Sequence, residues 1–153
     1  MGNNSSDGDI ENLLFIIANL PDFLKLSICR TKVKELAEMT DLEKKETIIR
    51  SLTSISLINQ DKLVELTKTW MKVISEIEPY ELTKILHSYL VILDNVKLFD
   101  KLDPKLILNT FSSLEESKRD KLLVCIKEAL FLNPNRGKIM KNIPTNLAKV
   151  ILN

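Results

Sequence analysis

The chain is poor in the residues that form tight turns. Its 153 residues include only three Gly and five Pro. A β-rich fold needs many turns, and the tight turns of hairpins favour Gly at fixed positions, so this composition argues against a β fold and favours helices. The shortage of Gly also argues against a Gly-rich phosphate-binding loop, which needs several glycines within a short stretch.

Side chains suited to catalysis and metal binding are equally scarce. His87 is the only histidine, and Cys29 and Cys125 are the only cysteines. Cys125 and His87 would supply a nucleophile and a base, but no third group is marked to orient them. We therefore predict that the chain is not an enzyme and has no metal site and no cofactor. Two buried free thiols are expected, with a single disulfide as the alternative.

Long hydrophobic runs and a strong net charge are also lacking. No stretch approaches the ~20 apolar residues that a membrane span needs, and the net charge of +1 creates no overall attraction to nucleic acid or membranes. We predict a cytoplasmic protein without a secretory leader. The start Met1-Gly2-Asn3-Asn4-Ser5-Ser6 matches a myristoylation pattern, so Gly2 would be lipidated only if the source is eukaryotic.

What the chain does contain is a recurring helix-start signal. An apolar residue is followed at once by a capping or turn residue, often with proline, and the first four apolar residues are 19 positions apart: Leu20, Met39, Ile58 and Ile77. The signal predicts about eight helices. They are expected near 10–19, 21–39 with a break at Arg30-Thr31, 41–57, 60–77, 79–93, 104–111, 115–132 and 145–152, with short helical turns at 98–102 and 138–142.

The same signals predict how the helices begin and where the domain lies. Thr40 and Ser113 each have capping-box spacing to a Glu three residues later, and Asn59 and Asp103 are expected N-caps. Residues 1–9 are rich in Asn, Ser, Gly and Asp, so a mobile tail is expected there. Residues 10–153 are then a single helical-repeat domain.

A longer period supports stacked helical hairpins. The apolar pairs Ile48-Ile49, Ile85-Leu86 and Leu122-Leu123 are 37 residues apart. Each pair falls at the same phase of the second helix of a hairpin, and such hairpins must stack to bury a shared apolar face. We predict an all-α fold, a right-handed superhelix of stacked hairpins in one domain. Trp70 and Tyr89 lie on apolar helical stripes and are expected in its core.

Two segments resemble a known type of helix start. Ile77-Glu78-Pro79-Tyr80-Glu81-Leu82 and Leu102-Asp103-Pro104-Lys105-Leu106-Ile107-Leu108 resemble the Leu-x-Pro-x-x-hydrophobic helix starts of two superhelical families. These are the N-terminal domain of MgtE-type magnesium transporters and the middle region of the flagellar motor switch protein. The resemblance covers about 39–132, implies a superhelical fold, and carries no functional residue to this chain.

Charge is distributed unevenly along the sequence. Residues 1–24 contain four acidic residues and no Lys or Arg, whereas 25–34 and 133–153 each contain four basic residues and no acid. A basic patch of this kind can contact phosphates, and the alternative is an ordinary solvated face. The candidate partner-binding residues are Lys25, Arg30, Lys32, Lys34, Arg136, Lys138, Lys141 and Lys149.

These observations favour a binding function. We expect a non-enzymatic protein-interaction domain, an adaptor or scaffold, because stacked hairpins form a concave face on which a partner helix can lie. The alternative is a nucleic-acid-binding protein that uses segments 25–34 and 136–149. That alternative requires the two segments to lie on one face of the molecule.

Overall fold

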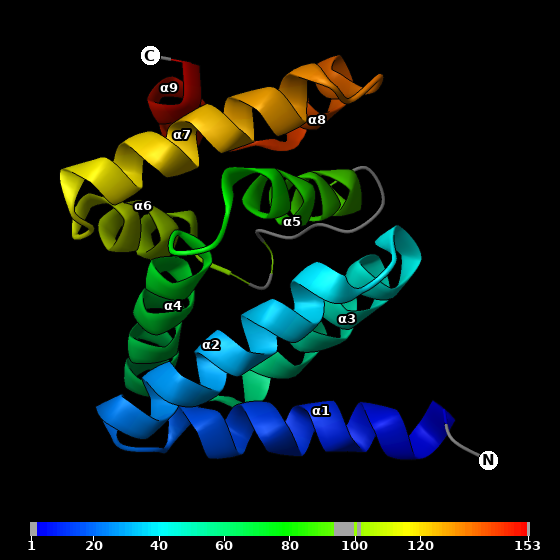
Figure 1. The fold of residues 1–153 in the computed structure, drawn as a ribbon, viewed down its shortest axis with the longest axis vertical. Coiled ribbons are helices and arrows are strands. Elements are labelled where there is room, and N and C mark those ends of the chain that lie inside the picture. Colours follow the sequence, from blue (N-terminus) through cyan, green and yellow to red (C-terminus); the bar gives the residue numbers. More distant parts are fainter. Residues whose placement is uncertain (1–2, 94–99, 101, 153) are drawn as a thin grey trace.

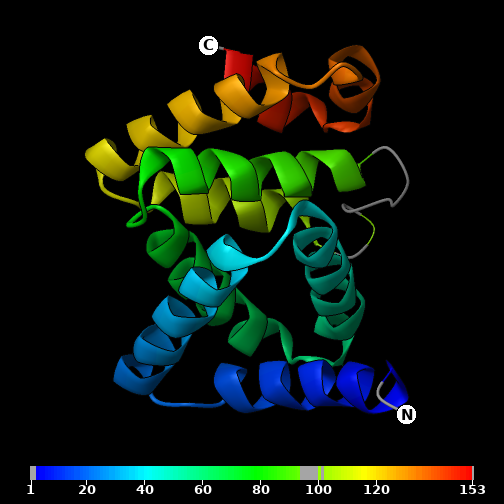
Figure 2. The ribbon, with the colours of Figure 1, turned by 45° about the vertical axis from the view of Figure 1, so that its right-hand side comes forward.

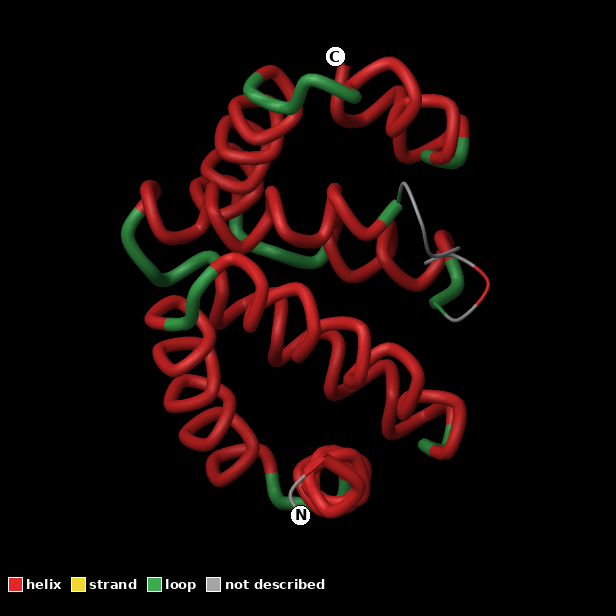
Figure 3. Tube along the Cα trace, turned by 90° about the vertical axis from the view of Figure 1, so that its right-hand side faces the viewer, coloured by secondary structure: helices red, strands yellow, loops and turns green. Residues whose placement is uncertain are grey.

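Every regular element of the chain is a helix in the part that the structure covers (Figure 3). The computed structural model describes residues 3–93, 100 and 102–152. The all-α prediction is confirmed. The elements are α1 (Asn3–Ala18), α2 (Asp22–Glu38), α3 (Asp41–Ser54), the 3-10 turn η1 (Ile55–Leu57), α4 (Gln60–Ile74), α5 (Pro79–Ile92), α6 (Pro104–Ser112), α7 (Glu116–Phe131), α8 (Arg136–Asn142) and α9 (Thr145–Leu152).

The helices pack in two rows. In one row α1 packs on α3, α3 on α5, α5 on α7 and α7 on α9, and in the other α2 packs on α4 and α4 on α6. Figure 1 shows α1 at one end of the long axis, α7, α8 and α9 at the other, and α5 between them. Contact between every second helix is what stacked hairpins produce. The right-handed superhelical twist remains a prediction.

The 37-residue period coincides with a repeated pattern of burial. Ile48, Ile85 and Leu122 are buried in α3, α5 and α7, and the residue that follows each of them is half-buried. Neighbouring helices of this row therefore meet through equivalent positions.

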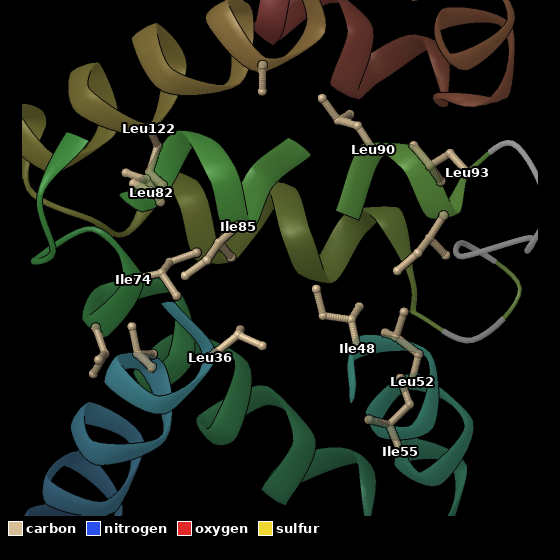
Figure 4. Packing of buried hydrophobic residues seen from close by; sticks show 14 of the residues in the cluster. Leu36, Ile48, Leu52, Ile55, Ile74, Leu82, Ile85, Leu90, Leu93 and Leu122 are labelled. Carbon is tan, nitrogen blue, oxygen red and sulfur yellow. The ribbon is translucent and has the colours of Figure 1, made fainter. Parts of the chain in front are cut away.

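Helix α5 carries the centre of the core. Leu82 and Ile85 are fully buried, and Figure 4 shows Ile85 directed toward Ile74 of α4 and Leu82 toward Leu122 of α7. Because α5 packs on α3 as well as on α7, it connects helices from the N-terminal and C-terminal halves of the chain. Burial of each such side chain stabilises the fold by about 1.5–3 kcal/mol.

Three predicted N-caps are confirmed by their hydrogen bonds. The Thr40 hydroxyl accepts from the backbone N–H of Glu43 at 3.2 Å. The carboxamide oxygen of Asn59 accepts from Asp61 N–H at 2.9 Å, and the carboxylate of Asp103 accepts from Lys105 N–H at 2.9 Å. Each bond satisfies a backbone donor that the first turn of a helix leaves without a partner.

The capping box predicted at Ser113 is wrong. Helix α7 begins at Glu116 with Glu115 as its N-cap and has no side-chain cap. Ser113 is instead the C-cap of α6, and its hydroxyl donates to the carbonyl of Thr110 at 2.7 Å. Carbonyls in the last turn of a helix are available as acceptors. The Ser113 hydroxyl therefore bonds a carbonyl in the last turn of α6 and does not cap α7.

Several predicted boundaries differ from the structure. Helices α3 and α4 end at Ser54 and Ile74, before the predicted ends at 57 and 77. Helix α1 begins at Asn3, before the predicted start at 10, and the mobility expected of residues 1–9 remains a prediction. Ser, Asn and Asp are also the residues favoured at helix starts, so their abundance does not distinguish a tail from a first turn. Helix α2 continues through Thr31, whose hydroxyl donates to the carbonyl of Ser27 at 3.3 Å. The Met1-Gly2 lipidation start and most of the predicted turn at 98–102 lie outside the described residues.

Candidate functional site

The structure does not bring the two basic segments together. Residues 25–34 lie on α2, whereas residues 136–149 lie on α8 and α9 at the C-terminal end of the long axis (Figures 1 and 2). Helix α5 packs against both α2 and α7, so it lies between the two segments. The structure therefore separates the two segments along the long axis, and the nucleic-acid hypothesis remains a prediction.

Three of the four basic residues on α2 form ion pairs. Lys25 is only 3% exposed, because it shares the buried helical phase of Cys29 and Val33, and its ammonium lies 3.8 Å from Asp22. This corrects its prediction as a surface contact. Arg30 bonds Glu76 at 3.0 Å and Lys32 bonds Glu35 at 3.1 Å. Lys34 is exposed.

One of the C-terminal basic residues, Arg136, contacts an exposed aromatic side chain. The Arg136 guanidinium lies 5.3 Å above the centre of the Phe131 ring, and it also donates to the Phe131 carbonyl at 3.4 Å. Lys138, Lys141 and Lys149 are exposed. Phe131 itself remains 71% exposed despite the guanidinium.

Sequence reasoning missed the main feature, a pair of apolar cavities. The N-terminal cavity is lined by α1, α2, α3 and α4 and has a volume of about 330 Å³. The C-terminal cavity is lined by α4, α5, α6, α7 and α9 and has a volume of about 240 Å³. Both are partly open to solvent and have walls that are almost wholly apolar. Concave, mostly apolar pockets are typical of binding sites, so these two are the best candidate here.

Four residues belong to the walls of both cavities: Thr67, Trp70, Tyr89 and Leu102. The indole Nε1–H of Trp70 donates to the hydroxyl of Tyr89 at 3.1 Å. Helix α4 places Trp70 and Thr67 on its inward stripe with Leu63. The two aromatic side chains therefore form a partition between the cavities, with polar atoms that satisfy one another.

The partition is held in an apolar environment. Burial raises the pKa of the Tyr89 hydroxyl to about 12, although the hydrogen bond from Trp70 opposes that shift by stabilising the phenolate. Tyr89 is thus a neutral hydrogen-bond acceptor at ordinary pH and is unsuited to act as a base.

Only the N-terminal cavity has a charged rim. Lys32 and Glu35, which bond one another, line this cavity from α2, and Thr47 and Ser51 line it from α3. The Ser51 hydroxyl donates to the Thr47 carbonyl at 2.9 Å. The N-terminal cavity can accordingly bind a group with an apolar body and a polar end, whereas the C-terminal cavity favours an apolar group.

Cys125 and His87, the pair considered for catalysis, line neither cavity, whereas Cys29 lies in the wall of the N-terminal cavity. Cys29 and Cys125 are free and buried, which confirms the prediction of thiols, and the Cys125 thiol donates to the carbonyl of Pro79 at 3.7 Å. Burial raises the pKa of the Cys29 thiol to about 11, against the opposing effect of the Lys25 charge. A high thiol pKa means little thiolate, and hence low reactivity, at neutral pH. His87 is half-buried on α5 and lines neither cavity.

The described residues contain no group of three or more His, Cys, Asp or Glu arranged to hold a metal ion. Among them there is also no helix long and apolar enough to cross a membrane. No family model, curated protein or solved structure matches the chain. The resemblance to the MgtE and motor-switch superhelices therefore remains a prediction that rests on its motifs.

Proposed function

We propose that the chain is a non-enzymatic protein-interaction domain that binds an apolar helix of a partner protein at the two cavities. One observation carries the proposal: two neighbouring cavities, lined almost wholly by apolar side chains, share four wall residues. Apolar side chains of a partner that enter these pockets remove apolar surface from water and gain dispersion contacts with the walls.

The size of the cavities favours single side chains over a whole helix. An α-helix is about 10–12 Å across, too wide for a cavity of a few hundred Å³. Single large side chains, such as Leu, Phe or Met, do fit. Recognition of an amphipathic helix commonly uses such anchors at helical spacing. The Trp70–Tyr89 partition would then lie between two successive anchors.

The distribution of polar groups sets the orientation of the partner. The Lys32–Glu35 pair and the hydroxyls of Thr47 and Ser51 are confined to the N-terminal cavity. A partner helix with polar residues near one end therefore fits in one direction better than in the other, because reversing it would desolvate those groups against apolar walls.

The protein partner is favoured over nucleic acid for a specific reason. The basic residues of 25–34 are largely paired with acids, and they are separated from 136–149 by α5. We also place the domain in the cytoplasm, a proposal supported by two free thiols that persist most readily in a reducing compartment.

Filling the shared wall tests the proposal. Thr67→Phe adds a ring where the cavities meet. It removes the hydrogen bond from the Thr67 hydroxyl to the Leu63 carbonyl at 2.8 Å. That carbonyl keeps its backbone hydrogen bond within α4, so the loss should affect stability little. Thr69→Phe is the matched control. Its hydroxyl donates in the same way, to the Glu65 carbonyl at 3.0 Å, but Thr69 lines neither cavity.

The two variants and the unchanged chain are used as tagged baits in nuclease-treated lysate, with quantitative mass spectrometry. We expect the unchanged chain and Thr69→Phe to capture one or more of the same proteins. The amount captured by Thr67→Phe should be lower by at least about tenfold, which corresponds to ~1.4 kcal/mol of binding free energy. The purified partner should then change the fluorescence of Trp70, the only tryptophan. Equal capture by all three baits would overturn the proposal, and so would loss of all capture after nuclease treatment, which would favour nucleic acid.

A further inference from the structure

The N-terminal cavity is long and narrow. Its wall extends from Ile10 to Ile17 along α1 and from Thr47 to Ile55 along α3. At ~1.5 Å per residue these stretches are about 10–12 Å long. The volume of about 330 Å³ is small for that length and lies at the lower end of the range of pockets that bind small molecules. A space of this shape fits a single alkyl chain better than a ring system or a two-chain lipid.

Four helices contribute apolar side chains to this wall. They include Leu13 of α1, Leu36 of α2, Leu52 of α3 and Leu66 of α4. Each methylene group that leaves water for such a wall strengthens binding by a factor of about four. An alkyl chain therefore gains affinity along its whole length, and the wall favours such a chain over a small polar molecule.

The polar side chains outside the wall shared by the two cavities come from α2 and α3. Lys32 and Glu35 bond one another at 3.1 Å, and their side chains are 37% and 50% exposed, so this pair lies where the cavity meets solvent. The Thr47 hydroxyl donates to the sulfur of Met39 at 3.5 Å, and the Ser51 hydroxyl donates to the Thr47 carbonyl at 2.9 Å. A ligand with an alkyl chain and one polar head group matches this division of the wall.

The same polar groups indicate which head group the cavity accepts. The Lys32 ammonium donates hydrogen bonds, whereas the Glu35 carboxylate accepts them. The hydroxyl oxygens of Thr47 and Ser51 also remain acceptors, because their protons are directed to other protein atoms. A carboxylate head cannot donate and an ammonium head cannot accept, but a hydroxyl head does both. The Lys32–Glu35 pair has no net charge, so a charged head gains no net attraction from it.

We propose that the N-terminal cavity binds a single-chain amphiphile with an uncharged hydroxyl head, its alkyl chain among the four helices and its hydroxyl beside Lys32 and Glu35. This small-molecule ligand goes beyond the proposed function. A bound chain fills space that a side chain of the partner protein needs, so the amphiphile also controls access of the partner. That last consequence rests on the proposed function, whereas binding of the amphiphile does not.

Three probes with the same alkyl chain test the head group: decan-1-ol, decanoate and decylammonium. Each is titrated into the purified chain at neutral pH, and binding is followed by the fluorescence of Trp70, the only tryptophan, which lies in the cavity wall. We expect decan-1-ol to bind saturably, one molecule per chain by calorimetry. It should bind at least about threefold more tightly than either charged probe, the scale of one exposed ion pair. Equal affinity for all three probes, or no saturable binding of decan-1-ol, would overturn the proposal.

Substitutions that fill one cavity at a time locate the ligand. Ser51→Phe places a ring in the N-terminal cavity only, and Val150→Phe places one in the C-terminal cavity only. Thr53→Phe is the matched control, because its hydroxyl also donates to a carbonyl of α3, at 2.8 Å, yet Thr53 lines neither cavity. Circular dichroism checks the fold, and Ser51→Leu replaces Ser51→Phe if the larger side chain prevents folding.

The affinity for decan-1-ol should fall at least about tenfold with the substitution at Ser51 and should change less than about twofold with the other two variants. A loss with Val150→Phe and none at Ser51 would place the ligand in the C-terminal cavity and overturn the proposal.

Changing the charged pair should change the preferred head group. Glu35→Gln leaves the Lys32 charge without its partner, so the affinity for decanoate should rise at least about threefold. Lys32→Met leaves the Glu35 charge, so the affinity for decylammonium should rise by a similar factor. Lys34→Met is the control, because Lys34 is exposed on α2 and lines neither cavity, and it should leave the order of the three probes unchanged. If neither affinity rises, the head group does not lie beside this pair and the proposal is wrong.

These titrations contain no partner protein, so their failure is distinguishable from failure of the proposed function. If decan-1-ol does not bind while Thr67→Phe still reduces capture of a partner, the ligand proposal is wrong and the proposed function stands. If decan-1-ol binds as expected while all baits capture the same proteins equally, the cavity is a ligand site and the proposed function is wrong.

Discussion

Trp70 and Tyr89 are joined by a hydrogen bond of 3.1 Å from the indole nitrogen to the phenol oxygen, and both side chains line both cavities. The bond connects α4 to α5. Aromatic side chains with polar tips usually find such a partner when they are buried. The bond gives the indole N–H an acceptor, and the remaining surface of both side chains in the cavity walls is apolar.

Tyr89→Phe should destabilise the fold modestly. The substitution keeps the ring but removes the acceptor of the Trp70 N–H, which should lower the free energy of unfolding by about 1 kcal/mol. Chemical denaturation monitored by circular dichroism measures this change. Tyr80→Phe is the control, because Tyr80 is 71% exposed, and its free energy of unfolding should stay within about 0.5 kcal/mol of the unchanged chain.

A double-mutant cycle separates the hydrogen bond from other effects. Trp70→Phe is combined with Tyr89→Phe, and the coupling energy should be about 0.5–1.5 kcal/mol. Strict additivity of the two substitutions would contradict a direct bond between these side chains.

The free energy of unfolding should decline at alkaline pH because two buried groups, the Cys29 thiol and the Tyr89 phenol, resist ionisation in the folded chain. The pKa of the Cys29 thiol rises from 9.0 to about 11, and that of Tyr89 from 10.0 to about 12, both chiefly because burial disfavours the charged form. Above its ordinary pKa the unfolded chain releases each proton while the folded chain retains it. The contribution of each group is therefore fully present below its ordinary pKa and is lost as pH rises through the folded value.

Variants assign each part of this decline. Cys29→Ala should remove the loss between pH 9 and 11, and Tyr89→Phe the loss between pH 10 and 12. Each proton contributes at most about 1.4 kcal/mol per pH unit. The free energy of unfolding is measured from pH 8 to pH 12 for each variant and for the unchanged chain. A constant difference between variant and unchanged chain across this range would refute the assignment.

The starts of the helices could be predicted because their signals are local. Pro79 and Pro104 occupy the first turns of α5 and α6, and the side chain of Asn59 caps α4, all within a few residues of the bonds they affect. Ser113 shows the limit of local signals. Two helix ends lie close to it, and the sequence spacing does not reveal which end its hydroxyl will bond.

The site could be predicted only in part, because it depends on distances between helices. Lys25 follows the helical phase of Cys29 and Val33, so helical periodicity alone was enough to place it on the buried side. The partner of Arg30 is Glu76, 46 residues away, and no local pattern indicates that pair. Only one sequence feature indicates the cavities: the short polar side chain of Thr67 interrupts the apolar stripe of α4.

Lys44 should stabilise the fold mainly through burial of its aliphatic methylene chain. The residue is 1% exposed, and its ammonium donates to the carbonyl of Met39, the C-cap of α2, at 2.9 Å. Lys44→Ala should lower the free energy of unfolding by about 2–4 kcal/mol, because it leaves a void and removes the donor. Lys44→Met retains most of the volume and should cost less than about 1.5 kcal/mol.

Thermal and chemical denaturation of both variants provide the comparison. Lys62→Ala, at an exposed position on α4, is the control and should change the free energy of unfolding by less than about 0.5 kcal/mol. Equal losses for Lys44→Ala and Lys44→Met would show that the charge and its hydrogen bond matter more than the buried stem.

Removing the hydroxyl of Thr110 should increase the stability of the fold. The residue is 1% exposed on α6, and its Oγ1 has no hydrogen-bond partner within the described part of the chain. An unsatisfied buried hydroxyl costs about 1–3 kcal/mol, and valine has nearly the same shape and a similar helix propensity. Thr110→Val should therefore raise the free energy of unfolding by about 1 kcal/mol.

The companion substitution Thr110→Ser makes the test specific to the hydroxyl. Serine keeps the hydroxyl and loses the buried methyl group, so the free energy of unfolding should fall by about 1 kcal/mol. Thr53→Val is the matched control on the surface, where the hydroxyl donates to the Arg50 carbonyl at 2.8 Å and its loss should change stability little. If Thr110→Val were instead less stable than the unchanged chain, the hydroxyl must be bonded in solution, and Thr110 would belong among the satisfied polar groups of the core.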